Sequence, residues 1–171
     1  MKALTEVLIE SSQLVRETGQ WILQQSSQFT SSDIIYKGTN DLVSFVDQQA
    51  EAKLKQGLSQ IFPEAAFIAE ETSSNYEEVG EGYYWVIDPL DGTTNFLHKL
   101  PVFAVSVGLI WNKQPVLGLI YEPNRDELFT AAKGHGAHLN GKPIQVSTEN
   151  SLSKSLLATG FPYYDFSYQD R

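Results

Sequence analysis

The sequence contains no cysteine and only 12 lysine and arginine residues among its 171. The absence of cysteine excludes disulfide bonds and thiolate metal sites. With 21 acidic residues the formal net charge is -9, and the few basic residues are scattered, so we expect no direct binding to nucleic acid. The sequence also lacks an apolar run long enough for a signal peptide or a membrane span. We therefore expect a cytoplasmic location and no membrane partner.

What is present is typical of a globular protein, with 42% apolar and 19% charged residues. This length is sufficient to bury one core, and we expect a single domain over residues 1–171. An acidic protein that handles an anionic substrate needs local positive charge, and bound cations can supply it. Clusters of carboxylates are therefore the candidate sites for such cations.

The first third of the chain is predicted to form two helices. Apolar residues recur at spacings of three, four and seven over residues 3–25, which indicates an amphipathic helix. Residues 26–36 are polar and favour a loop. A second apolar stripe over residues 47–62 predicts another helix, which Pro63 ends.

The chain that follows has the pattern of short strands separated by turns. Asn140-Gly141 is a strong hairpin signal, because both central residues of a type I′ turn need positive φ. Helices followed by consecutive strands favour an α+β fold, with the N-terminal helix pair packed on a mostly antiparallel sheet. The expected strands are residues 67–70, 83–88, 102–111, 116–121, 128–132, 137–139, 142–147 and 156–159.

Two carboxylates follow the strand that is richest in aromatic and β-branched residues. Asp88 is expected to end this strand, Pro89 removes a backbone donor and redirects the chain, and Asp91 comes three residues after Asp88. Gly92 permits a tight turn and Thr93 is a helix N-cap type, so a helix start is predicted. Because a helix start presents free N–H groups, this segment could hold cations with its carboxylates and a phosphate with its amides.

A second acidic strand end lies upstream at Ile68-Ala69-Glu70-Glu71. If both strands end at one edge of the sheet, Glu70 lies near Asp88. Clustered hard oxygen ligands suit Mg²⁺ or Mn²⁺ better than zinc. The alternative is that Asp-Pro and Asp-Gly mark an ordinary turn and that the paired glutamates belong to a solvated loop.

The whole string Asp88-Pro-Leu-Asp-Gly-Thr-Thr-Asn-Phe96 resembles the signature of the inositol monophosphatase family, which comprises lithium-sensitive, magnesium-dependent phosphatases. Three further segments are similar to that family in the same order: Asp41–Asp47, Ile68–Glu71 and Lys133–Gly141. The matching region runs from about residue 30 to about residue 160. The resemblance implies that the chain corresponds to the N-terminal part of the family's layered fold.

The resemblance implies roles for particular residues, with two or three Mg²⁺ ions in the family's intact site. The implied metal ligands are three carboxylates and one backbone carbonyl, those of Glu70, Asp88, Asp91 and Leu90. The implied catalytic residues, which orient and activate a metal-bound water, are Asp47, Thr93 and Glu70. The implied substrate-binding residues are Glu70, Leu90, Asp91, Gly92 and Thr93. Lys37 is implied to lie near the same cluster.

The function implied is hydrolysis of a small-molecule phosphate monoester, inositol monophosphate or a related sugar phosphate, by a protein that is expected to be a homodimer. The family has a later acidic ligand within a Trp-Asp motif, whereas the three tryptophans here precede Ile22, Val86 and Asn112. We therefore expect impaired activity in this chain. The alternatives are a bisphosphatase acting on fructose 1,6-bisphosphate or 3′-phosphoadenosine nucleotides, a non-catalytic protein-binding role like that of transcription-associated bacterial relatives, and metal binding without turnover.

Overall fold

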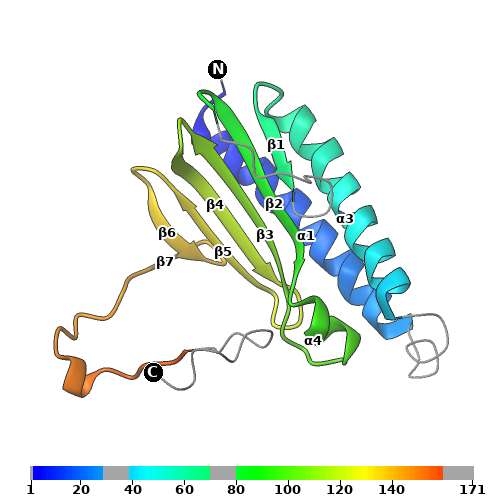
Figure 1. Cartoon of the computed structure of the whole chain (residues 1–171). Helices are drawn as coiled ribbons and strands as arrows, with labels where there is room; N and C mark the ends of the chain where they lie inside the picture. The colour runs from blue at the N-terminus through cyan, green and yellow to red at the C-terminus, as the bar shows by residue number, and fades with distance from the viewer. Residues whose placement is uncertain (1, 29–38, 70–79, 160–171) are drawn as a thin grey trace.

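The computed structural model describes residues 2–28, 39–69 and 80–159 (Figure 1). Two long helices, α1 (Leu4–Gln28) and α3 (Thr39–Ile61), come first. The strands follow, with a short helix α4 (Thr93–Leu97) after the second of them and a 3₁₀ turn η1 (Leu152–Lys154) near the end. The strands are β1 (Ala66–Ala69), β2 (Tyr83–Asp91), β3 (Ala104–Trp111), β4 (Gln114–Glu122), β5 (Glu127–Ala132), β6 (Gly136–Leu139) and β7 (Lys142–Ile144).

The strands form one sheet whose spatial order is the same as their order along the chain. Only β1 and β2 pair in parallel in this sheet, and the other neighbouring strands are antiparallel. Figure 1 shows α1 and α3 side by side on one face of the sheet. The predicted α+β fold with a helix pair on a mostly antiparallel sheet is confirmed.

The core lies between the helix pair and the inner face of the sheet. Val15 of α1 and Leu54 of α3 are fully buried there, and Trp85 of β2 is buried against them. Burial alternates along β3, as expected for a strand with one face on a core. Each buried side chain stabilises the fold by roughly 25 cal/mol per Å² of apolar surface removed from water. This packing fixes the position of β2, whose C-terminal end carries the predicted site.

Several predicted boundaries differ from those in the structure. Helix α3 begins at Thr39 rather than at residue 47. The aromatic and β-branched residues before Asp47 have low helix propensity and did not indicate a helix. Burial of side chains such as Val46 in the core outweighs that propensity. Residues 26–28 of the predicted loop are helical, because α1 continues to Gln28. Residues 29–36 lie outside the described ranges.

The predicted strand at residues 156–159 is wrong, and the strand predicted for 142–147 ends at Ile144. Leu156 is 99% exposed and Leu157 is 70% exposed. A strand needs a neighbour to pair with its backbone N–H and C=O groups, and these residues have no ladder partner among the described strands. Apolar, β-type composition therefore does not produce a strand here.

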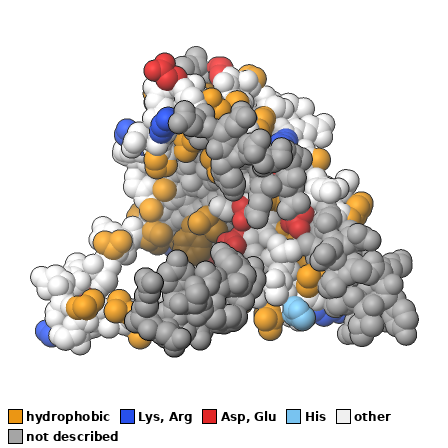
Figure 2. Space-filling model, viewed as in Figure 1, with side chains coloured by type: hydrophobic (Ala, Val, Ile, Leu, Met, Phe, Trp, Pro, Cys, Tyr) orange, Lys and Arg blue, Asp and Glu red, His pale blue; other side chains and the backbone are white. Residues whose placement is uncertain are grey.

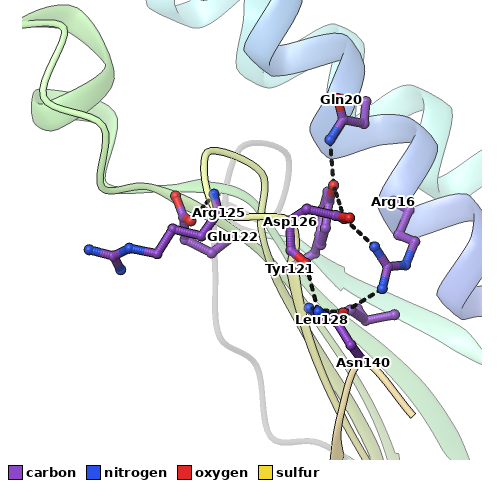
Figure 3. Close-up of polar contacts among 8 residues, drawn as sticks. All are labelled: Arg16, Gln20, Tyr121, Glu122, Arg125, Asp126, Leu128 and Asn140. Atoms are coloured by element: carbon purple, nitrogen blue, oxygen red, sulfur yellow. Dashed lines mark hydrogen bonds and ion pairs between the residues drawn. The ribbon is translucent and has the colours of Figure 1, made fainter.

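Tyr121 of β4 attaches helix α1 to the sheet (Figure 3). Its ring lies so close to Gly19 that a Cβ on that glycine would be 2.5 Å from Cδ1 of the ring. Its buried hydroxyl accepts a hydrogen bond from Gln20 and donates one of 2.9 Å to Asp126. Arg16 forms an ion pair with Asp126 and lies 5.3 Å from the centre of the Tyr121 ring. A polar network thus joins α1 to the turn between β4 and β5.

We expect the free energy of unfolding to depend on Tyr121 at alkaline pH. Burial raises the pKa of its phenol above the usual value near 10. A raised pKa in the folded state means that this contribution is complete below about pH 10 and is lost as pH rises through the folded-state pKa. Tyr121→Phe should therefore reduce the part of the stability loss above about pH 10 that comes from this phenol. Urea unfolding of both proteins at several pH values measures this difference.

Urea unfolding of the same two proteins near neutral pH gives the reference value of the free energy of unfolding. There Tyr121→Phe should be less stable by about 1 kcal/mol, because the Gln20 and Asp126 side chains lose a hydrogen-bond partner. Equal slopes of stability against pH above about pH 10 in both proteins would contradict the assignment of this titration to Tyr121.

The outer face of the sheet, opposite the helices, has an apolar hollow, part of which is visible in Figure 2. It encloses a cavity of about 580 Å³ lined mainly by apolar residues from β2 to β7. Val86 and Ile120 on neighbouring parts of this face are 37% and 49% exposed.

Within the described ranges, no helix is both long and apolar enough to cross a membrane.

Candidate active site

A bulge at the end of β2 places the two predicted carboxylates at one cavity. Strand β2 does not end at Asp88, as predicted, but continues through Pro89 to Asp91, and its register with β3 shifts between Asp88 and Asp91. A proline cannot donate to a ladder, and a bulge is one of the few places in a sheet that tolerates it. In a regular strand, residues three apart face opposite sides. The shift in register breaks that alternation, and both side chains border the same cavity.

Helix α4 begins immediately after this bulge, as the sequence predicted. Its N-cap is Gly92, with φ of 96° and ψ of 34°, rather than Thr93. The Gly92 carbonyl accepts a hydrogen bond of 3.0 Å from the Phe96 amide. The left-handed backbone at Gly92 allows the chain to reverse from strand to helix within one residue.

Two hydrogen bonds connect the bulge to the first turn of α4. The Leu90 amide donates to Oδ1 of Asp88 at 3.2 Å, and the Thr93 hydroxyl donates to the Leu90 carbonyl at 3.0 Å. The Leu90 side chain is 1% exposed and anchors this segment in the core. The backbone that carries the predicted carbonyl ligand is therefore held from both sides.

A cavity of about 370 Å³ opens over this segment. Carboxylates, a hydroxyl and backbone groups of consecutive residues border it, and Figure 2 shows acidic side chains beside the apolar hollow of the sheet. Such oxygen donors match the ligand preference of Mg²⁺. The described residues that line the cavity are Asp88, Leu90, Asp91, Gly92, Thr93, Thr94 and Asn95.

The remaining predicted residues lie elsewhere or are not described. Asp47 is 4% exposed and belongs to α3, which contacts α4. Glu70 and Lys37 lie outside the described residues. Among those that are described, no group of three or more His, Asp or Glu side chains is arranged to hold a metal ion. The described part of the site thus contributes two carboxylates and a carbonyl.

Asn95 was expected only as part of the string from residue 88 to 96, and Val102 only as the first residue of a strand. In the structure the Asn95 side-chain amide donates a hydrogen bond of 2.8 Å to the Val102 carbonyl. The Leu100 amide donates to the Asn95 carbonyl, also at 2.8 Å. An asparagine directly after a helix start is the only sequence signal for this contact, and nothing in the sequence marks its partner.

Comparisons with known proteins show the family to which this chain belongs. The family model described as "Inositol monophosphatase family" matches residues 3–166. The chain belongs to the inositol monophosphatase family. It is 44% identical over 163 residues to inositol monophosphatase 2 of Solanum lycopersicum, covering 93% of this chain and 59% of that protein. The structure of inositol monophosphatase from Anabaena (Nostoc) sp. PCC 7120 superimposes with a TM-score of 0.76 at 39% identity, covering 95% of this chain and 57% of that one.

Relatives within the family have names that describe different roles. Fructose-1,6-bisphosphatase/inositol-1-monophosphatase of Aquifex aeolicus is 40% identical over 144 residues, covering 84% of this chain and 54% of that protein. Nus factor SuhB of Escherichia coli is 40% identical over 148 residues, covering 86% and 55%. The chain spans little more than half the length of these members of the inositol monophosphatase family.

Proposed function

We propose that this chain carries the metal-binding and phosphate-binding part of a Mg²⁺-dependent phosphomonoesterase that hydrolyses inositol monophosphate or a related sugar phosphate. The observation that supports the proposal is the cavity bordered by Asp88, Asp91 and the Leu90 backbone next to the turn at Gly92. Family membership supports phosphatase chemistry on small phosphate esters. We further propose that residues 1–171 form one domain corresponding to the N-terminal part of the family fold.

In this proposal the cation is held by the carboxylates of Asp88 and Asp91, the Leu90 carbonyl and Glu70. The described donors are all hard oxygens, which fits Mg²⁺. The parallel pairing of β1 with β2 supports including Glu70, because the last pair is Ala69 with Ile87 and each is followed in sequence by a predicted ligand. Bound Mg²⁺ supplies neutralisation of the phosphate oxygens and a lowered pKa for a water molecule.

The proposed proton route uses the Thr93 hydroxyl and the Asp47 carboxylate. In the structure the Thr93 hydroxyl donates to the Leu90 carbonyl. If the Leu90 carbonyl held a cation, it would be a poorer acceptor, and the Thr93 hydroxyl would be able to donate to Asp47 instead. The contact between α3 and α4 supports this pairing. The Thr93 oxygen would then accept a hydrogen bond from the attacking water. As the water gives its proton to the Thr93 oxygen, the hydroxyl proton of Thr93 would pass to the Asp47 carboxylate, which is the general base.

Two alternatives keep support from the comparisons. The name of the Aquifex aeolicus relative includes bisphosphatase activity, which favours fructose 1,6-bisphosphate as a second substrate to test; 3′-phosphoadenosine nucleotides belong in the same panel. The Nus factor relative favours a protein-binding role as the alternative to catalysis. A homodimer and a cytoplasmic location are part of the main proposal, the first from family resemblance and the second from composition.

The test is release of inorganic phosphate by the purified chain from a panel of phosphate esters. Inositol 1-phosphate should be hydrolysed with Mg²⁺ and not with EDTA, at a rate reduced relative to a family member of full length. Binding of Mg²⁺ measured by calorimetry in the same samples separates a metal-binding chain without turnover from an active one. Failure to bind Mg²⁺ or to release phosphate from any ester would overturn the proposed function.

A further inference from the structure

Helix α4 is too short to be held by its own backbone. It has 5 residues, whereas isolated helices of fewer than about 12 residues are marginal in water. Contacts with the rest of the molecule must therefore fix the turn that precedes it. Two such contacts are evident: the Phe96 ring packs edge-on against Phe103, with 5.4 Å between ring centroids, and the Asn95 side chain bonds to Val102.

The Asn95 contact fixes the backbone that faces the Gly92 turn. A Cβ placed on Gly92 would be 3.0 Å from the Val102 carbonyl oxygen and 3.3 Å from Cα of Phe103. The same Val102 oxygen accepts the hydrogen bond from the Asn95 amide. The Val102 carbonyl therefore lies close to the Gly92 turn and also accepts the hydrogen bond from Asn95, which connects the Asn95 side chain to the surroundings of the turn.

We propose that Asn95 is a positioning residue for phosphate, acting through the Val102 carbonyl on the Gly92–Thr93 turn. This inference rests on the proposed function, together with the expectation from the sequence that the amides of that turn hold the phosphate. The carboxylates are anchored differently, because Asp88 and Asp91 belong to β2 and are held by pairing with β3. Loss of the Asn95 contact should thus lower the affinity for phosphate more than the affinity for Mg²⁺.

The test is Asn95→Ala in the full 171-residue chain, probed by calorimetry with Mg²⁺ alone and then with inorganic phosphate in the presence of Mg²⁺. The Mg²⁺ affinity should stay within about twofold, and the phosphate affinity should fall about tenfold. Asn95→Asp keeps the size of the side chain but replaces the donor with an acceptor that faces a carbonyl. It should weaken phosphate binding at least as much as Asn95→Ala does. It also serves as the second variant if Asn95→Ala does not fold.

The matched control is Asn112→Ala. The Asn112 side chain also makes a backbone hydrogen bond of 2.8 Å, accepting from the Gly82 amide, but at the opposite end of β2. Its φ of 47° makes alanine strained there, so this control should cost at least as much stability. It should leave both affinities unchanged if the effect of Asn95 is positional rather than a general loss of stability.

A readout without ligand distinguishes positioning from direct contact. In amide hydrogen exchange, Asn95→Ala should speed exchange at Phe96, whose amide bonds to the Gly92 carbonyl, and at Leu100, whose amide bonds to residue 95. Asn112→Ala should not. Unchanged exchange at Phe96, or equal losses of Mg²⁺ and phosphate affinity, would overturn the inference. If the unmodified chain bound no phosphate in the presence of Mg²⁺, the proposed function would fail and the inference with it.

Discussion

Asp91→Asn is expected to weaken Mg²⁺ binding by about 100-fold or more and to abolish Mg²⁺-dependent phosphate release. Asp91 is the last residue of β2, is exposed, and borders the cavity together with Asp88. Replacing its carboxylate with an amide removes a full charge next to a divalent cation but leaves the size of the side chain nearly unchanged. Calorimetric titration with Mg²⁺ and a phosphate-release assay measure the two effects.

The fold should be unaffected by this substitution, because the Asp91 side chain is exposed. Glu81→Gln is the matched control, since Glu81 is also an exposed carboxylate and lies just before β2, at the end of the strand opposite to Asp91. It should retain the Mg²⁺ affinity of the unmodified chain. If Asp91→Asn bound Mg²⁺ as tightly as Glu81→Gln, the cavity would not be the metal site, and the phosphatase proposal would lose its main support.

Gly92→Ala is expected to lower the free energy of unfolding by about 2–4 kcal/mol and to remove phosphate binding in the presence of Mg²⁺. Two costs add at this position. The φ of 96° is unfavourable for any residue with a Cβ, and that Cβ would be 3.0 Å from the Val102 carbonyl oxygen. The neighbouring Phe103 backbone prevents an easy shift, since its Cα would be 3.3 Å away. Urea unfolding and phosphate titration measure the two consequences.

Gly82→Ala separates these two costs. Gly82 also has a positive φ, of 112°, but an added Cβ would have no atom within 4 Å. This substitution should cost only about 1–2 kcal/mol, the cost of the left-handed backbone. The difference between the two variants then measures the contact with Val102 and Phe103. Equal losses of stability would show that the turn can move away from this contact, which would also weaken the case for Asn95.

The sequence was informative about elements whose signals are local. The apolar stripe of α1, the hairpin at Asn140-Gly141 and the order of helices before strands depend on short-range patterns, and the structure contains all three. The sequence was misleading where apolar composition suggested a strand, because a strand forms only when another strand pairs with its backbone. Leu156 and Leu157 are apolar, as strand residues often are, but no strand of the described sheet lies beside them in a ladder.

By itself the sequence determined the chemistry available at the site. Two carboxylates, a glycine and a threonine in one short string specify hard oxygen donors beside a turn, and this holds whatever the fold. Only the tertiary structure decided how they meet. The bulge between Asp88 and Asp91 arises from pairing with β3, and the Asn95 bond to Val102 joins residues that no periodicity relates. The physical reason is that side-chain chemistry belongs to each residue, whereas convergence depends on backbone register and on contacts between separate segments.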